Sequence, residues 1–226
     1  MYKDSIPHLI VMLTKDDYTV ENAIEIFESC KHTSAKFWGF KEKPLSMDKM
    51  KTLVSKMKEF GKTPFMEIVS YTEEEGIESA KIAAECGVEV IMGTKFYPSI
   101  LRYCLQRGIK YMPFVGIVEG RPSVLTGEIS DILREATEVI TAGAFGIDLL
   151  GYRHVDDPVR LNNKLVTELH APVCIAGSID SYERLDEIKK TKPWAFTIGS
   201  AFFDNKFNGS FAEQINKVCE YMSLPF

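Results

Sequence analysis

The sequence predicts a single (β/α)8 barrel that spans all 226 residues. Eight short apolar runs alternate with eight segments of helical periodicity, and each pair takes about 20 to 35 residues, the length that a β-α crossover needs. The apolar runs are almost continuous, as expected for parallel strands covered on both faces. An open doubly wound sheet is the alternative. A nucleotide-binding version of that sheet is disfavoured because no G-x-G-x-x-G follows the first run.

The expected elements follow one another without a linker, a low-complexity stretch or a shift in composition. The expected strands are residues 8–14, 36–43, 64–71, 88–94, 109–117, 145–152, 172–178 and 194–200. The expected helices are residues 20–30, 47–61, 73–87, 99–108, 128–143, 156–170, 182–190 and 211–222. Serines at 46 and 181 have the position of N-caps, and glycines at 61, 87, 108 and 143 have the position of left-handed residues that end helices.

Charge and composition narrow the classes of partner. The net charge of -5 and the isoelectric point near 5.5 argue against a nucleic acid or an anionic membrane as the main partner. No apolar run approaches membrane-spanning length, and the first residues do not resemble a signal peptide. The five cysteines include no C-x-x-C pair, which indicates reduced and mostly buried thiols. We therefore expect a soluble cytoplasmic protein.

Two turns near the carboxyl end of the chain predict a phosphate site. The seventh expected strand ends on Gly177 and Ser178, and the eighth ends on Gly199 and Ser200. In a barrel, the loops after strands seven and eight often bind phosphate. A glycine lets a backbone N–H approach a ligand closely, a serine adds a hydroxyl donor, and a following helix adds free N–H groups. The alternative is that both are ordinary strand-to-helix turns, where glycine and serine are common.

The segment from "APVCIAGSID" to "TIGSAFF" resembles the phosphate-binding end of the ribulose-phosphate-binding barrels. These include the histidine- and tryptophan-pathway isomerases, the hexosamine-phosphate epimerases and the aldolases of the keto-deoxy-phosphogluconate type. "IGSA" resembles their motif after strand eight, whereas "AGS" replaces the more usual double glycine after strand seven. The resemblance implies a small phosphorylated ligand held by Gly177, Ser178, Gly199 and Ser200.

Two carboxylates interrupt apolar strands and are the expected acid/base pair. Glu67 lies in "PFMEIVSY" and Asp148 in "FGIDLLGY". A carboxylate among such neighbours has either a partner or a raised pKa. On strands three and six they could face each other across the barrel mouth as general acid and base. The alternative is that each forms a structural ion pair with a barrel lysine.

Basic residues at strand ends supply the other candidates. Lys95 and Lys41 could form a Schiff base or stabilise an anion, and Lys95 is the first choice, although a surface role for it is equally compatible with its sequence. Arg153 could clamp a second anionic group of the substrate. Asp16 either joins the site or belongs to a solvated turn that caps the first helix.

No metal or other cofactor is expected. His154 alone among the histidines falls on the functional side of the predicted barrel, which is weak support for a metal site. The sequence has no G-x-S-x-G and no cysteine–histidine pairing that would support covalent hydrolysis.

Three functions remain open, all with a small phosphorylated metabolite as ligand. The preferred one is a sugar-phosphate isomerase or epimerase that moves a proton next to a carbonyl. The second is a Schiff-base aldolase of a keto acid phosphate: "FMEIVSYTEEE" resembles the glutamate-bearing strand of those aldolases, but their lysine would fall on strand six, where "GIDLLG" has none. The third is a regulator similar to the glycerol-phosphate-responsive antiterminators, which the acidic charge disfavours.

A homodimer is left open. Phe202 and Phe203 look exposed after the last strand, but we expect them to pack against the barrel base or the first helix rather than to form a dimer patch.

Overall fold

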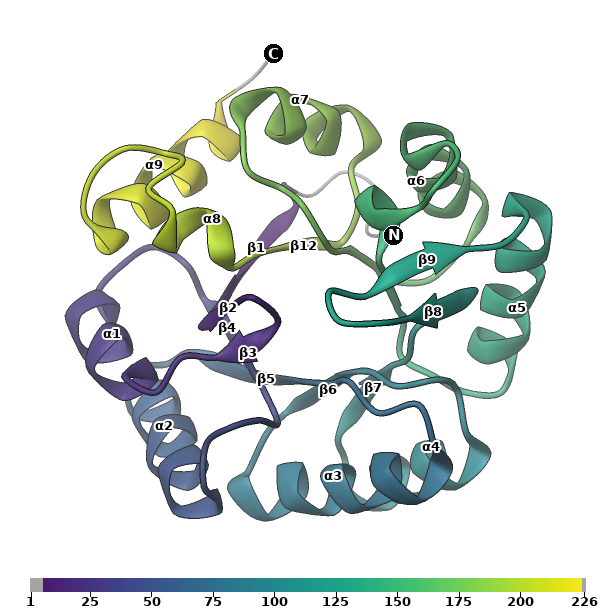
Figure 1. Cartoon of the computed structure of the whole chain (residues 1–226), viewed down its shortest axis with the longest axis horizontal. Helices are drawn as coiled ribbons and strands as arrows, with labels where there is room; N and C mark the ends of the chain where they lie inside the picture. The colour runs from purple at the N-terminus through teal and green to yellow at the C-terminus, as the bar shows by residue number, and fades with distance from the viewer. Residues whose placement is uncertain (1–5, 225–226) are drawn as a thin grey trace.

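The chain folds into a closed ring of eight parallel strands surrounded by helices, as the computed structural model of residues 6–224 shows (Figure 1). The strands follow the ring in the order β10-β11-β12-β1-β4-β5-β6-β7. Their bounds are β1 His8–Met12, β4 Phe37–Lys41, β5 Thr63–Ile68, β6 Val90–Gly93, β7 Lys110–Met112, β10 Ile147–Leu149, β11 Val173–Ile175 and β12 Ala195–Ile198. The ring closes between β7 and β10, where the amide of Asp148 donates to the carbonyl of Pro113 at 2.9 Å. The predicted (β/α)8 barrel is confirmed.

A helix follows each strand of the ring. The long helices are α1 Ala23–Cys30, α2 Met47–Glu59, α3 Glu73–Cys86, α4 Pro98–Arg107, α5 Ile129–Thr141, α6 Pro158–Glu168, α7 Tyr182–Thr191 and α9 Phe211–Ser223. The expected caps are confirmed: Ser46 accepts from the Lys49 amide, Ser181 accepts from the Arg184 amide, and Gly87 and Gly108 are left-handed. Within residues 6–224, no helix has the length and apolar character that crossing a membrane requires.

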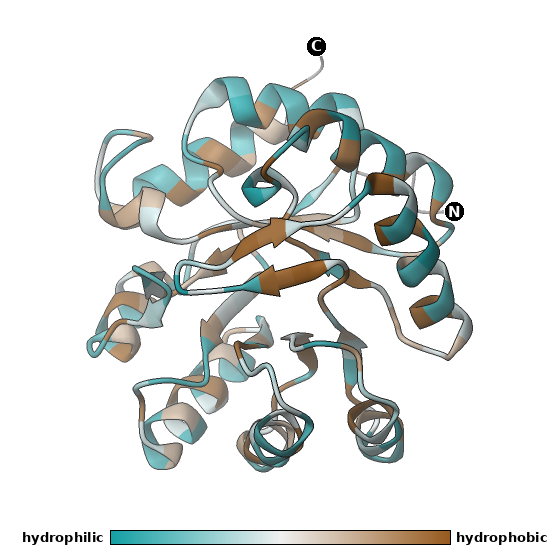
Figure 2. Cartoon of the chain, turned by 45° about the vertical axis from the view of Figure 1, so that its right-hand side comes forward, coloured by the Kyte–Doolittle hydropathy of each residue, from teal (hydrophilic) through white to brown (hydrophobic). Residues whose placement is uncertain are grey.

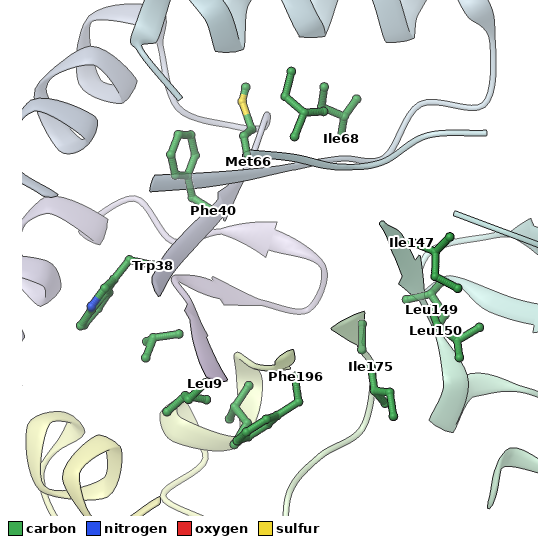
Figure 3. Packing of buried hydrophobic residues seen from close by; sticks show 14 of the residues in the cluster. Leu9, Trp38, Phe40, Met66, Ile68, Ile147, Leu149, Leu150, Ile175 and Phe196 are labelled. Atoms are coloured by element: carbon green, nitrogen blue, oxygen red, sulfur yellow. The ribbon is translucent and has the colours of Figure 1, made fainter. Parts of the chain in front are cut away.

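Apolar side chains pack in two layers, one on each side of the strands. The larger layer fills the space between strands and helices, and Figure 3 shows Met66 and Ile68 of β5 and Ile147 and Leu149 of β10 within it. The helices turn their brown, apolar sides toward the strands in Figure 2. A smaller cluster fills the interior of the ring, and its members are Ile10, Met12, Phe65, Val90, Met92, Met112, Cys174 and Ala195. Strand alternation divides the side chains between the layers, so a polar residue one position from an outward apolar one points into the barrel.

Aromatic rings in tilted and edge-to-face contact close the amino-terminal end of the barrel. His8 lies against Phe37, with ring centroids 4.9 Å apart. Trp194 contacts Phe37 at 5.6 Å and Phe145 at 5.5 Å. We refer to His8, Phe37, Phe145 and Trp194 as the aromatic floor.

Two hairpins that the sequence analysis did not predict lie over the opposite end of the barrel. The first pairs β2 (Thr14–Lys15) with β3 (Tyr18–Thr19), and the second pairs β8 (Ile117–Glu119) with β9 (Val124–Thr126). Both point toward the centre of the ring in Figure 1. The prediction of one strand over 109–117 is therefore wrong: β7 ends at Met112, and the chain leaves the ring to build the second hairpin.

Two short helical turns also follow strands, namely η1 (Gly151–Arg153) after β10 and α8 (Ser200–Phe203) after β12. The α8 turn buries Phe202, whose ring stacks on Phe207 and Phe211. Phe202 thus packs inside the protein, as expected, but against the α9 region rather than the barrel base or the first helix.

Candidate active site

A cavity of about 240 Å³ opens at the carboxyl ends of the barrel strands. Its wall includes both glycine–serine turns and the side chains of Lys41, Glu67 and Asp17. This is the end of a (β/α)8 barrel where ligands bind. The cavity therefore combines backbone donors and ionised side chains in one site.

The two predicted phosphate turns lie side by side because β11 and β12 are hydrogen-bonded neighbours. Gly177, Ser178, Gly199 and Ser200 all line the cavity. Within the described part of the chain, the amide N–H groups of these four residues form no hydrogen bond with another protein group. Four unpaired donors around one space can accept the oxygens of a phosphate group.

The two glycines are required where side chains of other elements come close. A Cβ on Gly177 would lie 2.7 Å from Cγ of Arg153, and the φ of +84° at this residue is itself unfavourable for other residues. A Cβ on Gly199 would lie 2.7 Å from Oγ1 of Thr14 in the first hairpin. The bare backbone of both turns is therefore packed directly against the rest of the site.

Lys41 lies between two carboxylates. The register of β4 and β5 sets Lys41 beside Glu67, and its Nζ is 3.3 Å from Glu67 Oε1 and 3.1 Å from Asp17 Oδ1. Lys41 is 4% exposed. Burial alone would lower the pKa of Lys41, but the charges of Glu67 and Asp17 outweigh it and hold the pKa above its ordinary value. Lys41 is therefore a charged ammonium at neutral pH.

Asp17 connects Lys41 to Arg153. Nη1 of Arg153 is 3.2 Å from Asp17 Oδ2 and Nη2 is 3.3 Å from Oδ1, an end-on bidentate pair. The amide of Ser123, in the second hairpin, donates to Asp17 Oδ2 at 3.1 Å. Burial acts to raise the pKa of Asp17, but Lys41 and Arg153 outweigh it and lower the pKa to about 2. Asp17 is thus the shared anion of the site.

Asp16 was expected either in the site or in a solvated turn; in the structure it lies in the exposed turn of the first hairpin, and Asp17 lines the cavity instead. Asp16 is exposed, and it is the amide of Asp16, at 3.4 Å from Ser200 Oγ, that approaches the phosphate turns. Both aspartates have left-handed backbone angles, with φ of 50° and 64°. These angles turn the hairpin so that Asp17 points down into the barrel mouth and Asp16 points outward. The pair of consecutive aspartates was the available signal, but only the hairpin decides between them.

Arg121 was also missed, and it ties the two hairpins together. Its Nη1 donates to the carbonyl of Asp17 at 3.2 Å, and its Nη2 donates to the carbonyl of Val69 at 3.2 Å and lies 3.4 Å from Glu42 Oε1. The guanidinium also lies over the ring of Tyr18, 4.9 Å from its centroid. The second hairpin is thereby held over the first.

Asp148 points into the barrel beneath the cavity and does not line it. Its side chain is fully buried, and neither carboxyl oxygen has a hydrogen-bond partner among the described residues. Burial first and then the nearby charge of Glu67 raise the pKa of Asp148 well above its ordinary value, which favours the protonated form. The expected arrangement, with Glu67 and Asp148 facing each other across the mouth, is not what the structure has: Glu67 reaches the cavity and Asp148 lies below it.

Lys95 and His154 lie outside the cavity wall. Gly93 and Thr94 have φ of +81° and +62°, which turns the chain away from the barrel axis and leaves Lys95 exposed. His154 accepts from the amide of Asp157 through Nδ1 at 3.2 Å, and its Nε2 contacts the carbonyl of Gly127 at 3.0 Å. The first choice among the lysines is therefore replaced by Lys41.

The fold is shared with several solved enzymes, although the sequence matches no protein-family model and no curated protein sequence. An N-acetylmannosamine-6-phosphate 2-epimerase from Clostridium perfringens has a TM-score of 0.63 at 14% identity, covering 97% of this chain and 95% of that one. An N-(5'-phosphoribosyl)anthranilate isomerase from Pyrococcus furiosus has a TM-score of 0.66 at 13% identity, covering 95% and 98%. A 4-hydroxy-2-oxoglutarate/2-dehydro-3-deoxyphosphogluconate aldolase has a TM-score of 0.66 at 13% identity, covering 95% and 94%. The resemblance to the ribulose-phosphate-binding barrels is confirmed at the level of the fold.

Proposed function

We propose that this protein is an enzyme that isomerises or epimerises a small phosphorylated sugar by moving a proton next to a carbonyl group. The observation that carries the proposal is that one cavity is lined both by four unpaired backbone donors and by the Lys41–Glu67 ion pair. Such a cavity suits a ligand with a phosphate at one end and reacting carbons at the other. The structural relatives named above include an isomerase and an epimerase, which is compatible with this chemistry.

In the proposed reaction, the turns after β11 and β12 hold the phosphate through the amides of Gly177, Ser178, Gly199 and Ser200. The carbonyl oxygen of the substrate accepts a hydrogen bond from the ammonium of Lys41. The carboxylate of Glu67 takes the proton from the carbon next to the carbonyl, and the negative charge that develops on the oxygen is stabilised by Lys41. In an aldose–ketose isomerisation, Glu67 then delivers the proton to the former carbonyl carbon, and the hydroxyl proton of the neighbouring carbon passes to the former carbonyl oxygen, which gives the isomer.

Asp17 and Asp148 support this pair without carrying the proton from the substrate. Asp17 fixes the position of Lys41 through the 3.1 Å contact and keeps it charged. Asp148 is buried below the cavity, so we assign it an influence on Glu67 rather than contact with the substrate. The raised pKa of Asp148 favours its protonated form, which lowers the repulsion between the two neighbouring carboxyl groups.

The aldolase alternative is disfavoured by the charge of Lys41. A Schiff base forms only from an unprotonated amine, and the two carboxylates around Lys41 hold its pKa above the ordinary value. On strand β10, where the resemblance to the aldolases would require a lysine, the inward side chain is Asp148.

The proposal is tested by proton exchange. A panel of aldose and ketose phosphates is incubated with the protein in D2O, and the loss of the proton next to the carbonyl is followed by proton NMR. We expect exchange with at least one sugar phosphate, and its loss in the E67Q variant with the affinity for inorganic phosphate retained. Equal exchange in the wild-type protein and E67Q would reject the assignment. Borohydride trapping of a substrate-dependent adduct on Lys41 would favour the aldolase, and binding without exchange across the panel would favour a regulator.

A further inference from the structure

The basic residues that line the cavity are not all free to bind a substrate. Among the described residues, three basic side chains line the cavity: Lys41, Arg153 and Lys206. A substrate with a second anionic group, such as a carboxylate, needs one of them free. The contacts of each basic residue show whether one of them is free.

Lys41 and the end-on edge of Arg153 are occupied by the protein's own carboxylates. Lys41 contacts both Asp17 and Glu67. Both terminal nitrogens of Arg153 contact Asp17, and Nη1 also donates to the carbonyl of Ser123 at 3.2 Å. A carboxylate on the substrate would meet Asp17 and Glu67 there, and like charges at such distances repel strongly in a partly desolvated site.

Lys206 and the Nε–H of Arg153 also line the cavity, together with the carboxylates of Asp180 and Asp204. Nε of Arg153 has no hydrogen-bond partner among the described residues, and it lies 3.0 Å from the position that a Cβ of Gly177 would take. Lys206 follows α8, and its amide donates to the carbonyl of Ala201 next to the turn of Gly199 and Ser200. The two terminal nitrogens of Arg153 thus bind Asp17, while its Nε–H lies next to the turn of Gly177.

We infer that the site takes a phosphomonoester whose carbon skeleton carries no carboxylate, because Lys41 and both terminal nitrogens of Arg153 already neutralise Asp17 and Glu67. The inference rests on the proposed function and narrows it: the substrate is a phosphorylated polyhydroxy aldehyde or ketone, and keto acid phosphates are excluded by charge. Asp17 sets this specificity.

The test compares two probes that share a three-carbon skeleton and a terminal phosphate. Glycerol 3-phosphate has a hydroxymethyl group where 3-phosphoglycerate has a carboxylate. Dissociation constants are measured by isothermal titration calorimetry for both probes and for inorganic phosphate, on the whole protein. We expect 3-phosphoglycerate to bind at least about tenfold more weakly than glycerol 3-phosphate, the effect of one unfavourable charge contact in a partly desolvated site.

The D17N variant supplies a test in the opposite direction. The substitution removes the anion that occupies Lys41 and Arg153, so we expect 3-phosphoglycerate to gain affinity and the ratio of the two dissociation constants to fall about tenfold or more. E42Q is the matched control. Glu42 contacts Arg121 but does not line the cavity, so the ratio of the two dissociation constants in E42Q should equal that of the wild-type protein. If D17N does not fold, E67Q is used instead. It removes the other carboxylate that contacts Lys41, so the ratio of the two dissociation constants should fall in the same way.

The outcomes separate the inference from the proposed function. Equal or tighter binding of 3-phosphoglycerate by the wild-type protein overturns the inference and leaves the phosphate site standing. A ratio that is unchanged in the folded D17N variant overturns the role of Asp17. Failure of both esters and of inorganic phosphate to bind overturns the phosphate site, and the proposed function with it.

Discussion

Glu67 on β5 and Asp148 on β10 show how two similar carboxyl groups acquire opposite properties. Each interrupts an apolar strand, and each points into the barrel. Glu67 contacts Lys41 and reaches the cavity. Asp148 has no hydrogen-bond partner for either oxygen among the described residues, and its pKa is raised well above its ordinary value by burial and by Glu67. One carboxyl group has a cation beside it, and the other has none.

Strand register causes this difference. The residue paired with Glu67 on the neighbouring strand β4 is Lys41, whereas the residues paired with Asp148 are Cys174 on β11 and Phe114 after β7. The pKa of the Cys174 thiol is itself raised, by burial first and then by Asp148 and Glu67. Whether a buried carboxyl group has a cation beside it therefore depends on the residue that the adjacent strand places opposite it, and its own strand does not show this.

The largest effect that would sharpen this comparison is the loss of turnover in E67Q. The amide keeps the shape of the side chain but cannot accept the proton, so we expect turnover of the sugar phosphate found in the exchange assay to fall about 10² to 10⁴-fold. Steady-state kinetics measure the change. E42Q is again the control, since Glu42 is a buried carboxylate with an arginine partner outside the cavity. Similar turnover in E67Q and E42Q would contradict the distinction drawn here.

Removing Lys41 should leave Glu67, like Asp148, buried without a cation beside it. In K41M, Asp17 and Glu67 lose their common cation, and we expect the free energy of unfolding to fall by about 3 to 5 kcal/mol, as when one partner of a buried ion pair is removed. Denaturant unfolding at neutral pH measures the change. K43M, two residues along the chain with an exposed side chain, should shift the free energy by less than about 0.5 kcal/mol. Equal stability of the two variants would show that Lys41 is not required by its carboxylates.

The D148N variant should remove a pH dependence of stability. The unfolded chain releases the aspartate proton near pH 4, while folded Asp148 keeps it to a higher pH because its pKa is raised. The folded state therefore binds more protons in this window, and its stability falls as pH rises by about 1.4 kcal/mol per pH unit.

The D148N side chain binds no proton, so its free energy of unfolding should exceed that of the wild-type protein by an amount that grows from about pH 4 upward. Unfolding curves between pH 4 and 8 measure this, and D156N, at an exposed aspartate, should follow the wild-type protein. Parallel curves for D148N and the wild-type protein would mean that Asp148 is ionised when folded.

The smallest expected effect is that of a substitution in the turn after β12. S200A removes one hydroxyl donor and leaves the backbone amides in place, so we expect the affinity for inorganic phosphate to fall about tenfold. Calorimetric titration measures the change. Combined with E67Q, the effects on phosphate affinity and turnover should be independent, because the two groups have no common contact. A strong coupling would show that the two groups do not act separately.

Periodicity was sufficient to predict the barrel, its strands and most of its helices. Continuous apolar runs, serine N-caps and glycine ends are local signals, and eight repetitions of them leave little choice of architecture. The turns at 177–178 and 199–200 could be predicted to be neighbours because consecutive strands of a barrel are adjacent.

The remaining parts of the site depend on contacts that local patterns do not carry. The two hairpins have strands of two or three residues, too short for any periodicity to register. Without them, neither the choice of Asp17 over Asp16 nor the reach of Arg121 across the mouth can be inferred. The sequence places Lys95 at a strand end, but left-handed angles at Gly93 and Thr94 turn the chain after β6 and keep Lys95 out of the cavity wall. Threonine rarely adopts such angles, so this turn could not be predicted.

The aromatic floor has a consequence for the order of events at the site. Since rings of His8, Phe37, Phe145 and Trp194 fill the far end of the barrel, a ligand that enters beneath the two hairpins has to leave through the same opening. In the proposed reaction, reactant and product would share this one passage, and each turnover would wait until the previous molecule has left it.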